Sequence, residues 1–278
     1  MSALRARRHK GAIAEAFARC EAEGRAAFVP YLCAGDPDLE RTPALLEALV
    51  SAGADVIELG VPFSDPIADG PTVQKAASRA LEAGTTVSGI LGLVAENRQR
   101  LGVPIVLFTY FNPIHRRGVR TFAEQAAASG VDGVLCVDLP PEEAEDETVP
   151  AFLANGLDPI FLVAPTSTDL RIKSVARVSK GFVYYVSRTG VTGERDSLPA
   201  ELVSDLARLR KKVKLPVAVG FGISTPVQVA EVAAVAQGVV VGSALVRVIE
   251  DNLDEPDLAA RMQARAGELA GALIRGGK

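Results

Sequence analysis

The sequence predicts an α/β fold in which eight parallel strands close into a barrel surrounded by helices, with one extra helix at the N-terminus. Eight short apolar segments alternate with helical segments along the 278 residues, as expected when helices connect parallel strands. The strand segments are apolar at nearly every position, which is typical of a sheet covered on both faces. Eight such units in roughly 250 residues match the size of a (β/α)8 TIM barrel.

The strands are predicted from apolar runs that end at Gly, Pro or Asp. The expected strands, in chain order, are residues 26–33, 54–59, 104–110, 132–139, 158–164, 181–187, 216–220 and 238–241. The first of them ends in the sequence CAGDP, which lacks the G-x-G-x-x-G pattern of a nucleotide-binding open sheet. This absence favours the barrel over the doubly wound alternative.

The helices are predicted from apolar positions that recur every three or four residues. The first covers residues 12–23, with Ile13, Ala16 and Phe17 on one face and Gly24 at its end. The others are expected at residues 39–52, 72–82, 86–100, 121–129, 142–147, 169–179, 200–212, 226–236 and 258–274. Thr121 is expected to cap its helix, and residues 111–115 are expected to form a loop.

The composition indicates a soluble globular protein, with 48% apolar and 23% charged residues. A formal net charge of −4 argues against a nucleic-acid-binding protein, which usually has a basic surplus. No apolar run approaches the roughly 20 residues of a membrane span. The basic residues at 5–10 are not followed by an apolar segment, so no signal peptide is expected. We expect residues 1–278 to form a single cytoplasmic domain, without a nucleic-acid or membrane partner.

The cysteines and histidines give no sign of a metal site. Cys20, Cys33 and Cys136 are widely spaced and odd in number, so neither a disulfide framework nor a thiolate metal site is expected. His9 and His115 are the only histidines, which makes a multi-histidine metal centre implausible.

Residues 56–71 (VIELGVPFSDPIADGP) are the leading candidate for the functional site. Glu58 lies at the end of the second strand, and active sites of such barrels lie at the C-terminal strand ends. Asp69 follows in a loop long enough to return over that end. Burial is expected to raise the pKa of Glu58, which suits proton transfer; a structural ion pair is the alternative. For Asp65, a solvated or loop-bracing aspartate is the favoured interpretation.

Glycines and aromatic residues complete the expected site. Glycine-bearing turns follow the sixth, seventh and eighth strands, at residues 190–193, 220–222 and 242–243. Such turns let backbone amides approach a phosphate, and residues 242–243 are expected to begin a helix whose positive end favours an anion. Each glycine could instead serve only a tight turn. The aromatic residues on strands that could line a flat pocket, with core packing as the alternative, are Tyr31, Phe108, Tyr110 and Tyr184.

Five motifs together resemble the tryptophan synthase alpha chain family. They are GDP at residues 35–37, ELGVPFSDP at 58–66 with ADGP at 68–71, SRTGVTG at 187–193, GFGI at 220–223 and VGSA at 241–244. The second motif is highly specific to that family, whereas the glycine turns occur in many phosphate-binding barrels. The resemblance runs from about residue 12 to the end of the chain. Tyr31 stands where phenylalanine is expected, and Phe108 where leucine is common.

The resemblance implies a carbon–carbon lyase that cleaves indole-3-glycerol phosphate by a retro-aldol reaction into indole and glyceraldehyde 3-phosphate. By resemblance, Glu58 protonates indole C3 and helps to remove the proton of the hydroxyl next to the ring. Asp69 accepts the indole N–H bond and stabilises positive charge on that nitrogen. Thr192 belongs to a lid that closes toward Asp69, and Tyr184 lies near the reacting side chain. The implied phosphate cradle consists of Gly193, Phe221, Gly222, Gly242 and Ser243.

The resemblance also implies a partner, a pyridoxal-phosphate-dependent beta chain that receives indole through a tunnel, in an alpha2beta2 tetramer. The implied docking face consists of Pro62 to Pro66, Asn112 and Asp138-Leu139-Pro140. No cofactor or metal is expected in this chain. Two alternatives remain at this point, another phosphate-sugar barrel enzyme and a non-catalytic barrel that activates a beta partner. The first of these gives no reason for Asp69.

Overall fold

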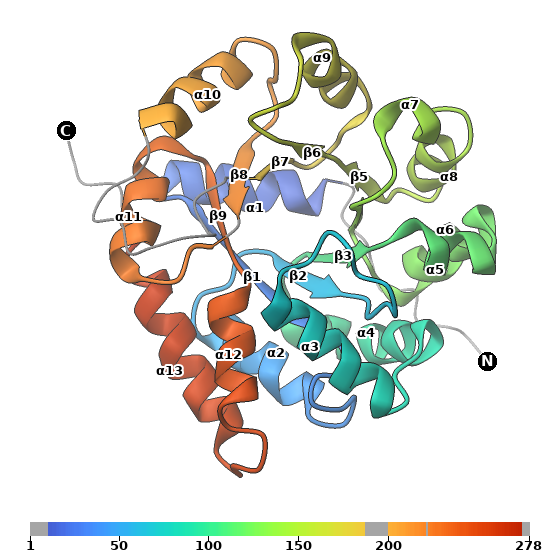
Figure 1. Cartoon of the computed structure of the whole chain (residues 1–278), viewed down its shortest axis with the longest axis vertical. Coiled ribbons are helices and arrows are strands. Elements are labelled where there is room, and N and C mark those ends of the chain that lie inside the picture. Colours follow the sequence, from blue (N-terminus) through green and yellow to red (C-terminus); the bar gives the residue numbers. More distant parts are fainter. Residues whose placement is uncertain (1–10, 187–199, 221, 274–278) are drawn as a thin grey trace.

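Parallel strands surround a central axis in the computed structural model, which describes residues 11–186, 200–220 and 222–273 (Figure 1). The strands of these residues are β1 Ala27–Cys33, β2 Ile57–Gly60, β3 Ile105–Thr109, β4 Gly133–Cys136, β5 Asp158–Ile160, β6 Leu162–Val163, β7 Val183–Val186, β8 Val217–Gly220 and β9 Gly238–Val241. Their order in the sheet is β5-β4-β3-β2-β1-β9-β8-β7-β6. Each neighbouring pair is parallel.

The two ends of this sheet meet in one chain segment, which closes the barrel. β5 pairs with β4, and β6 pairs with β7, while only Phe161 separates β5 from β6. The amide of Tyr184 donates to the carbonyl oxygen of Phe161 at 3.1 Å, so the contact with β7 continues across the interruption. The predicted fifth strand, residues 158–164, therefore exists in two pieces. The predicted (β/α)8 barrel is confirmed.

Helices connect the strands and cover the barrel from outside (Figure 1). They are α1 Ala12–Ala22, α2 Thr42–Ser51, α3 Pro71–Glu82, α4 Val87–Leu101, α5 Phe111–Arg117, α6 Val119–Ser129, α7 Pro141–Ala144, α8 Thr148–Ala154, α9 Asp169–Val178, α10 Ala200–Arg210, α11 Pro226–Val235, α12 Ser243–Glu250 and α13 Leu258–Ala270. In the parts of the chain described here, no helix is both long and apolar enough to cross a membrane.

Two local predictions near α5 are wrong. Residues 111–115 belong to helix α5 rather than to a loop. The carboxylate of Asp138 accepts the amide of Phe111, the first residue of α5, at 2.7 Å. This capping contact comes from a residue 27 positions later, so the local sequence gives no sign of it. Thr121 does not cap α6, because that helix begins two residues earlier, after Gly118.

Side chains alternate between the inside and the outside of the barrel, as the two-residue period of a strand requires. On β2, Ile57 and Leu59 pack with the helices in the larger apolar cluster. The smaller cluster fills the interior and includes Val29, Val106 and Leu135 from neighbouring strands. Glu58, between Ile57 and Leu59, therefore shares the interior face of the barrel.

Helix α1 closes the end of the barrel at which the strands begin; in Figure 1 it lies behind the strands. Its Ile13 and Phe17 are buried in the interior cluster, and the rings of Phe17 and Phe182 lie 5.4 Å apart. Glycines at the starts of two strands make room for these side chains. A Cβ at Gly133 would lie 2.9 Å from Ile13 Cδ1, and one at Gly238 would lie 2.8 Å from Phe17 Cε1. The opposite end is left for the site.

Candidate active site

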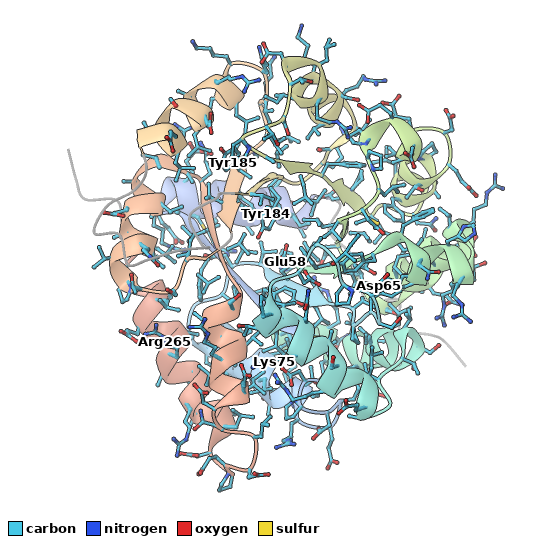
Figure 2. The ribbon with its side chains drawn as sticks, viewed as in Figure 1. Glu58, Asp65, Lys75, Tyr184, Tyr185 and Arg265 are labelled. Carbon is cyan, nitrogen blue, oxygen red and sulfur yellow. The ribbon has the colours of Figure 1, made fainter. Side chains whose placement is uncertain are left out.

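Glu58 is a buried carboxylate in the interior of the barrel, near its centre in Figure 2. It is 1% exposed and stands in register with Tyr31 of β1 and Val106 of β3. Among the described residues, its Oε1 atom is buried and has no hydrogen-bond partner. A buried carboxylate without such a partner is costly when it is charged. The surroundings of Glu58 therefore favour its protonated form.

The pKa of Glu58 follows from these surroundings. Burial, together with the nearby charge of Asp69, raises this pKa to about 8. At neutral pH the carboxyl group holds its proton and can act as an acid. The structural ion pair considered as an alternative for Glu58 finds no support at this oxygen, since no described group bonds Oε1.

Asp69 lies in the loop between β2 and α3 and is partly buried. Burial raises its pKa to about 6, against the lowering effect of a hydrogen bond from the Tyr110 hydroxyl. The same hydroxyl accepts the amide of Ala68 at 3.0 Å. Tyr110 directly follows β3, so its hydroxyl ties the Asp69 loop to the next strand of the barrel. At neutral pH Asp69 is ionised while Glu58 is not.

Three further aromatic residues from the prediction belong to the interior cluster around Glu58, namely Tyr31, Phe108 and Tyr184. The rings of Tyr31 and Phe108 meet edge to face at 5.5 Å. Burial raises the pKa of Tyr184 well above its ordinary value, and the charges of Glu58 and Asp69 act in the same direction. Figure 2 shows Tyr184 close to Glu58 in this view. The predicted aromatic lining is therefore gathered around the carboxylates.

Glycines at two strand ends give the tyrosine hydroxyls their room. A Cβ at Gly60, the last residue of β2, would lie 2.3 Å from Tyr31 Oη. A Cβ at Gly220, the last residue of β8, would lie 2.0 Å from Tyr184 Oη. No real Cβ contact is that short, so any larger residue would displace the ring. Gly220 therefore makes room for Tyr184. The sequence suggested only a tight turn or an approach to phosphate for this glycine.

The turns after β8 and β9 contain glycines of the predicted phosphate site, Gly222 and Gly242. Gly222 has φ +76°, a left-handed conformation that glycine adopts without strain. Helix α12 begins at Ser243, as predicted, and Gly242 precedes it. Its internal bonds start with the amides of Leu245 and Val246, which donate to the Gly242 carbonyl oxygen at 2.9 and 3.1 Å. The earlier amides at the positive end of the helix are thus available to an anion.

Some predicted residues fall outside the described part of the chain. Thr192, Gly193 and Phe221 lie in its gaps, as does the basic segment at residues 5–10. Asp65 is described and is exposed, consistent with a solvated residue. In the same loop the side chain of Ile67 is 80% exposed. Residues 11–186, 200–220 and 222–273 contain no group of three or more His, Cys, Asp or Glu side chains arranged for a metal ion.

An ion pair that the sequence analysis did not identify lies beside the site. Arg79 of α3 donates two hydrogen bonds to the carboxylate of Asp36, at 2.7 and 2.8 Å. The side chain of Asp36 is fully buried and that of Arg79 is 20% exposed. Asp36 belongs to the GDP motif at residues 35–37, which the sequence linked only to the family resemblance. A single arginine in an amphipathic helix, by contrast, gives no sign in the sequence that it turns inward.

Comparison with known proteins identifies close relatives. A family model described as the tryptophan synthase alpha chain matches residues 17–273. The tryptophan synthase alpha chain of Geobacter sulfurreducens is 56% identical over 238 residues, which cover 86% of this chain and 90% of the relative. That of Opitutus terrae is 48% identical over 266 residues, which cover 96% and 98% of the two chains.

Solved structures agree with these relatives. Tryptophan synthase subunit alpha from Legionella pneumophila has a TM-score of 0.87 at 37% identity, covering 94% of this chain and 98% of that chain. A chain in a structure of Mycobacterium tuberculosis tryptophan synthase has a TM-score of 0.86 at 39% identity, covering 95% and 98%. The likeness thus extends over nearly the whole length of both chains.

Proposed function

The chain belongs to the tryptophan synthase alpha chain family, and from this premise we propose that Glu58 and Asp69 perform the family's reaction. The chain is a lyase of tryptophan biosynthesis, which catalyses the retro-aldol cleavage of indole-3-glycerol phosphate to indole and glyceraldehyde 3-phosphate. The resemblance found from the motifs is thereby confirmed. Family membership does not favour a different phosphate-sugar enzyme or a non-catalytic activator.

Glu58 is the proton shuttle of the proposed mechanism. The observation that carries this role is its buried carboxyl group, whose pKa of about 8 keeps it protonated at neutral pH. Glu58 gives its proton to indole C3, which places positive charge on the indole nitrogen. As the bond from C3 to the glyceryl carbon breaks, its electron pair returns to the ring. The Glu58 carboxylate takes the proton of the adjacent hydroxyl, which becomes the aldehyde, so the catalyst is restored.

Asp69 is the electrostatic partner in this mechanism. With a pKa of about 6, it is an anion when Glu58 is a neutral acid. It accepts the indole N–H and stabilises the positive charge that develops on that nitrogen. Tyr110 supports this role, because its hydroxyl orients the carboxylate and holds the adjacent backbone.

Other residues hold the substrate. Tyr31, Phe108, Tyr110 and Tyr184 contact the planar indole and the carbon chain. The phosphate binds at Gly222, Gly242 and Ser243, where the start of α12 supports an anion site. Gly193 and Phe221 complete this cradle, and Thr192 closes over the site as part of a lid; these three lie outside the described residues.

Family membership implies a beta-chain partner. We propose an alpha2beta2 tetramer in the cytoplasm, with pyridoxal phosphate in the beta chain and no cofactor in this chain. The proposed docking face consists of Pro62 to Pro66, Asn112 and Asp138-Leu139-Pro140. The exposure of Ile67 beside it supports an apolar contact surface on this loop. Light scattering of the chain mixed with its beta chain measures the mass of the complex and so tests the tetramer. A complex with the mass of a dimer would exclude it.

The decisive experiment measures cleavage of indole-3-glycerol phosphate by the full chain and by Glu58→Gln. Glutamine keeps the size of the side chain but cannot transfer a proton. We expect kcat to fall by about 10²- to 10⁴-fold, with an unchanged circular dichroism spectrum. Normal turnover by Glu58→Gln would remove Glu58 from the mechanism. Small sugar phosphates, offered as substrates in parallel, should remain uncleaved.

A further inference from the structure

Helix α3 (Pro71–Glu82) continues directly from the loop that carries Asp69. The amide of Asp69 donates to the Pro66 carbonyl oxygen at 3.0 Å. In the first turn of the helix, Gln74 Nε2 donates to the carbonyl oxygen of Asp69 at 2.8 Å, and the Gln74 amide donates to that of Gly70 at 3.0 Å. The Gln74 side chain thus joins the backbone of Asp69 to the first turn of the helix, so a shift of α3 displaces Asp69.

The fully buried side chains of α3 are all small, although the half-buried Val73 also packs against the interior cluster. The buried residues of this helix are Ala76, Ala77 and Ala80. Each contributes a single methyl group, so the apolar area that these three side chains bury is small. These small side chains let α3 approach β1 and α12, against which it packs. They give it little of the interlocking that large side chains provide, so polar contacts have a larger share in fixing the helix.

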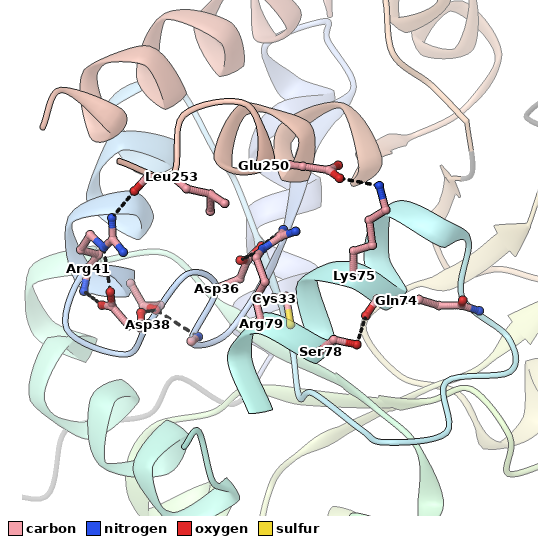
Figure 3. Close-up of polar contacts among 12 residues, drawn as sticks. Cys33, Asp36, Asp38, Arg41, Gln74, Lys75, Ser78, Arg79, Glu250 and Leu253 are labelled. Carbon is pink, nitrogen blue, oxygen red and sulfur yellow. Dashed lines mark hydrogen bonds and ion pairs between the residues drawn. The ribbon is translucent and has the colours of Figure 1, made fainter. Parts of the chain in front are cut away.

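Two ion pairs hold α3, and they differ in burial (Figure 3). Arg79 reaches the fully buried Asp36, just after β1, through two bonds of 2.7 and 2.8 Å. Lys75 bonds Glu250 of α12 at 2.7 Å, but its side chain is 64% exposed. Exposed pairs contribute little, whereas a planar guanidinium bonded twice to a buried carboxylate fixes both distance and orientation.

We propose that Arg79 is a positioning residue of the lyase reaction, which holds α3 against Asp36 and thereby places the Asp69 carboxylate at the indole nitrogen. This inference rests on the proposed role of Asp69. Arg79 need not touch the substrate. Its effect is geometric, since misplacement of a reacting or stabilising group by about 1 Å can lower a rate by 10²-fold.

The first test compares Arg79→Gln and Arg79→Lys with Lys75→Gln in the full chain. We expect Arg79→Gln to lower kcat by about 10- to 100-fold, with a smaller change in KM. Arg79→Lys keeps the charge without the twofold bond, so it should recover part of that loss. Lys75→Gln removes an exposed pair from the same helix and should stay within about twofold of the unmodified chain. Should Arg79→Gln not fold, Arg79→Lys decides alone.

The second test asks whether Arg79 acts through Asp69. The titratable groups that act on Asp69 or respond to its charge are Glu58, Tyr110, Tyr31, Tyr184 and Cys33. Of these, the Tyr110 hydroxyl lowers the pKa of Asp69 by its hydrogen bond. If α3 shifts and that bond is lost, the pKa of Asp69 rises and the acidic limb of the kcat/KM profile moves to higher pH. A residue that only stabilises the fold would change the melting temperature and leave this limb in place.

Asp69→Asn separates the outcomes. If Arg79 acts through Asp69, adding Arg79→Gln to Asp69→Asn lowers kcat little further, because the two changes affect one interaction. Additive losses, an unmoved acidic limb, or wild-type kcat in both Arg79 variants would overturn the inference while leaving the role of Asp69 intact. Undiminished activity of Asp69→Asn itself would instead reject the proposed mechanism, and the positioning role with it.

Discussion

Glu58 and Asp69 are carboxylates in one site, yet their surroundings separate their acidities. Glu58 is enclosed by the barrel and has a pKa raised to about 8. Asp69 is only partly buried and bonded by Tyr110, and its pKa is about 6. Pairs of titratable groups with separated pKa values are a common means of assigning acid and anion roles in enzymes. Between these values the site holds one proton, on Glu58.

The pH dependence of turnover follows from this assignment. In the proposed mechanism, Asp69 becomes protonated below about pH 6 and can no longer stabilise positive charge. Above about pH 8, Glu58 loses the proton that the mechanism requires it to donate. We expect a bell-shaped profile of kcat/KM, which reports the free enzyme, with limbs near these values, which belong to the coupled pair. In Asp69→Asn the acidic limb should vanish and the basic limb should move to lower pH. A profile that stays flat between about pH 5 and about pH 9 would contradict the assignment.

The stability of the fold should also depend on pH through Glu58. The folded-state pKa of Glu58 lies above its ordinary value of 4.5, so the folded chain binds more protons than the unfolded chain between these values. Stability therefore falls as pH rises through this window. Glu58→Gln removes this effect. As pH rises, the free energy of unfolding of Glu58→Gln should therefore increase relative to that of the unmodified chain, by up to about 1.4 kcal/mol per pH unit. The gain levels off above about pH 8.

Urea denaturation at several pH values measures this difference. The exposed Glu15 of α1 provides the matched control, since Glu15→Gln also removes one carboxylate. A difference between Glu58→Gln and the unmodified chain that stays constant with pH would show that Glu58 is not held in its protonated form.

At the scale of the elements, the strand ends matter because they combine a reactive group with the glycine that makes room beside it. On β2, Glu58 and Gly60 are two residues apart and share the interior face. Gly60 admits the hydroxyl of Tyr31, and Gly220 on β8 does the same for Tyr184. The lining of the site thus depends on the absence of a Cβ at two positions that carry no chemistry themselves.

Gly220→Ala tests this dependence. The new Cβ would lie 2.0 Å from Tyr184 Oη and 2.5 Å from its Cζ, so the ring must move. We expect a loss of about 1–3 kcal/mol in the free energy of unfolding, together with a lower kcat/KM. Gly92→Ala on α4 is the matched control, because nothing lies within 4 Å of its Cβ. In a helix that change should be neutral or stabilising by about 1 kcal/mol. Equal stability of the two variants would refute the packing argument.

The sequence predicted most elements from local patterns, although it missed α8, and several of the other misses have a common cause. The inward direction of Glu58 follows from the period of a strand, and the start of α12 follows from Gly242. Helix α5 was missed because its cap, Asp138, comes from a later loop. The bond from Tyr110 to Asp69 and the pair of Arg79 with Asp36 likewise join residues about 40 positions apart. Such contacts depend on tertiary packing and leave no periodic signal.

At the scale of the whole molecule, the candidate site lies at one end of the closed barrel, and the helix that packs into its base lies at the other. The strands end around Glu58 and begin around α1, whose Ile13 and Phe17 are buried inside the barrel. Residues at the starting end of such barrels contribute to stability rather than to catalysis. The size of the barrel and the alternation of its elements were visible in the sequence. The division of the fifth strand at Phe161 was not, because an unbroken apolar run covers it.

Phe17→Ala tests this separation. Removal of a buried aromatic ring should lower the free energy of unfolding by about 3–5 kcal/mol. At a temperature where the variant is folded, kcat should remain within about twofold, because Phe17 lies at the far end of the barrel from Asp69. Glu15→Ala, exposed on the same helix, should change stability by no more than about 0.5 kcal/mol. A loss of about tenfold in the kcat of folded Phe17→Ala would show that the two ends of the barrel are coupled.

The fit of α1 into the base of the barrel has a consequence for how this chain can change. Ile13 and Phe17 occupy spaces left by Gly133 and Gly238, more than 100 positions away in the sequence. A larger residue at Gly238 requires a smaller one at position 17, so these two positions are free to vary only together. At Gly133 the new Cβ would also lie 2.9 Å from the carbonyl oxygen of Asp158, so a smaller residue on the helix does not by itself make room there. Thermal tolerance can thus be adjusted by coordinated changes at the base while the catalytic mouth keeps its residues, and the two properties can be selected separately.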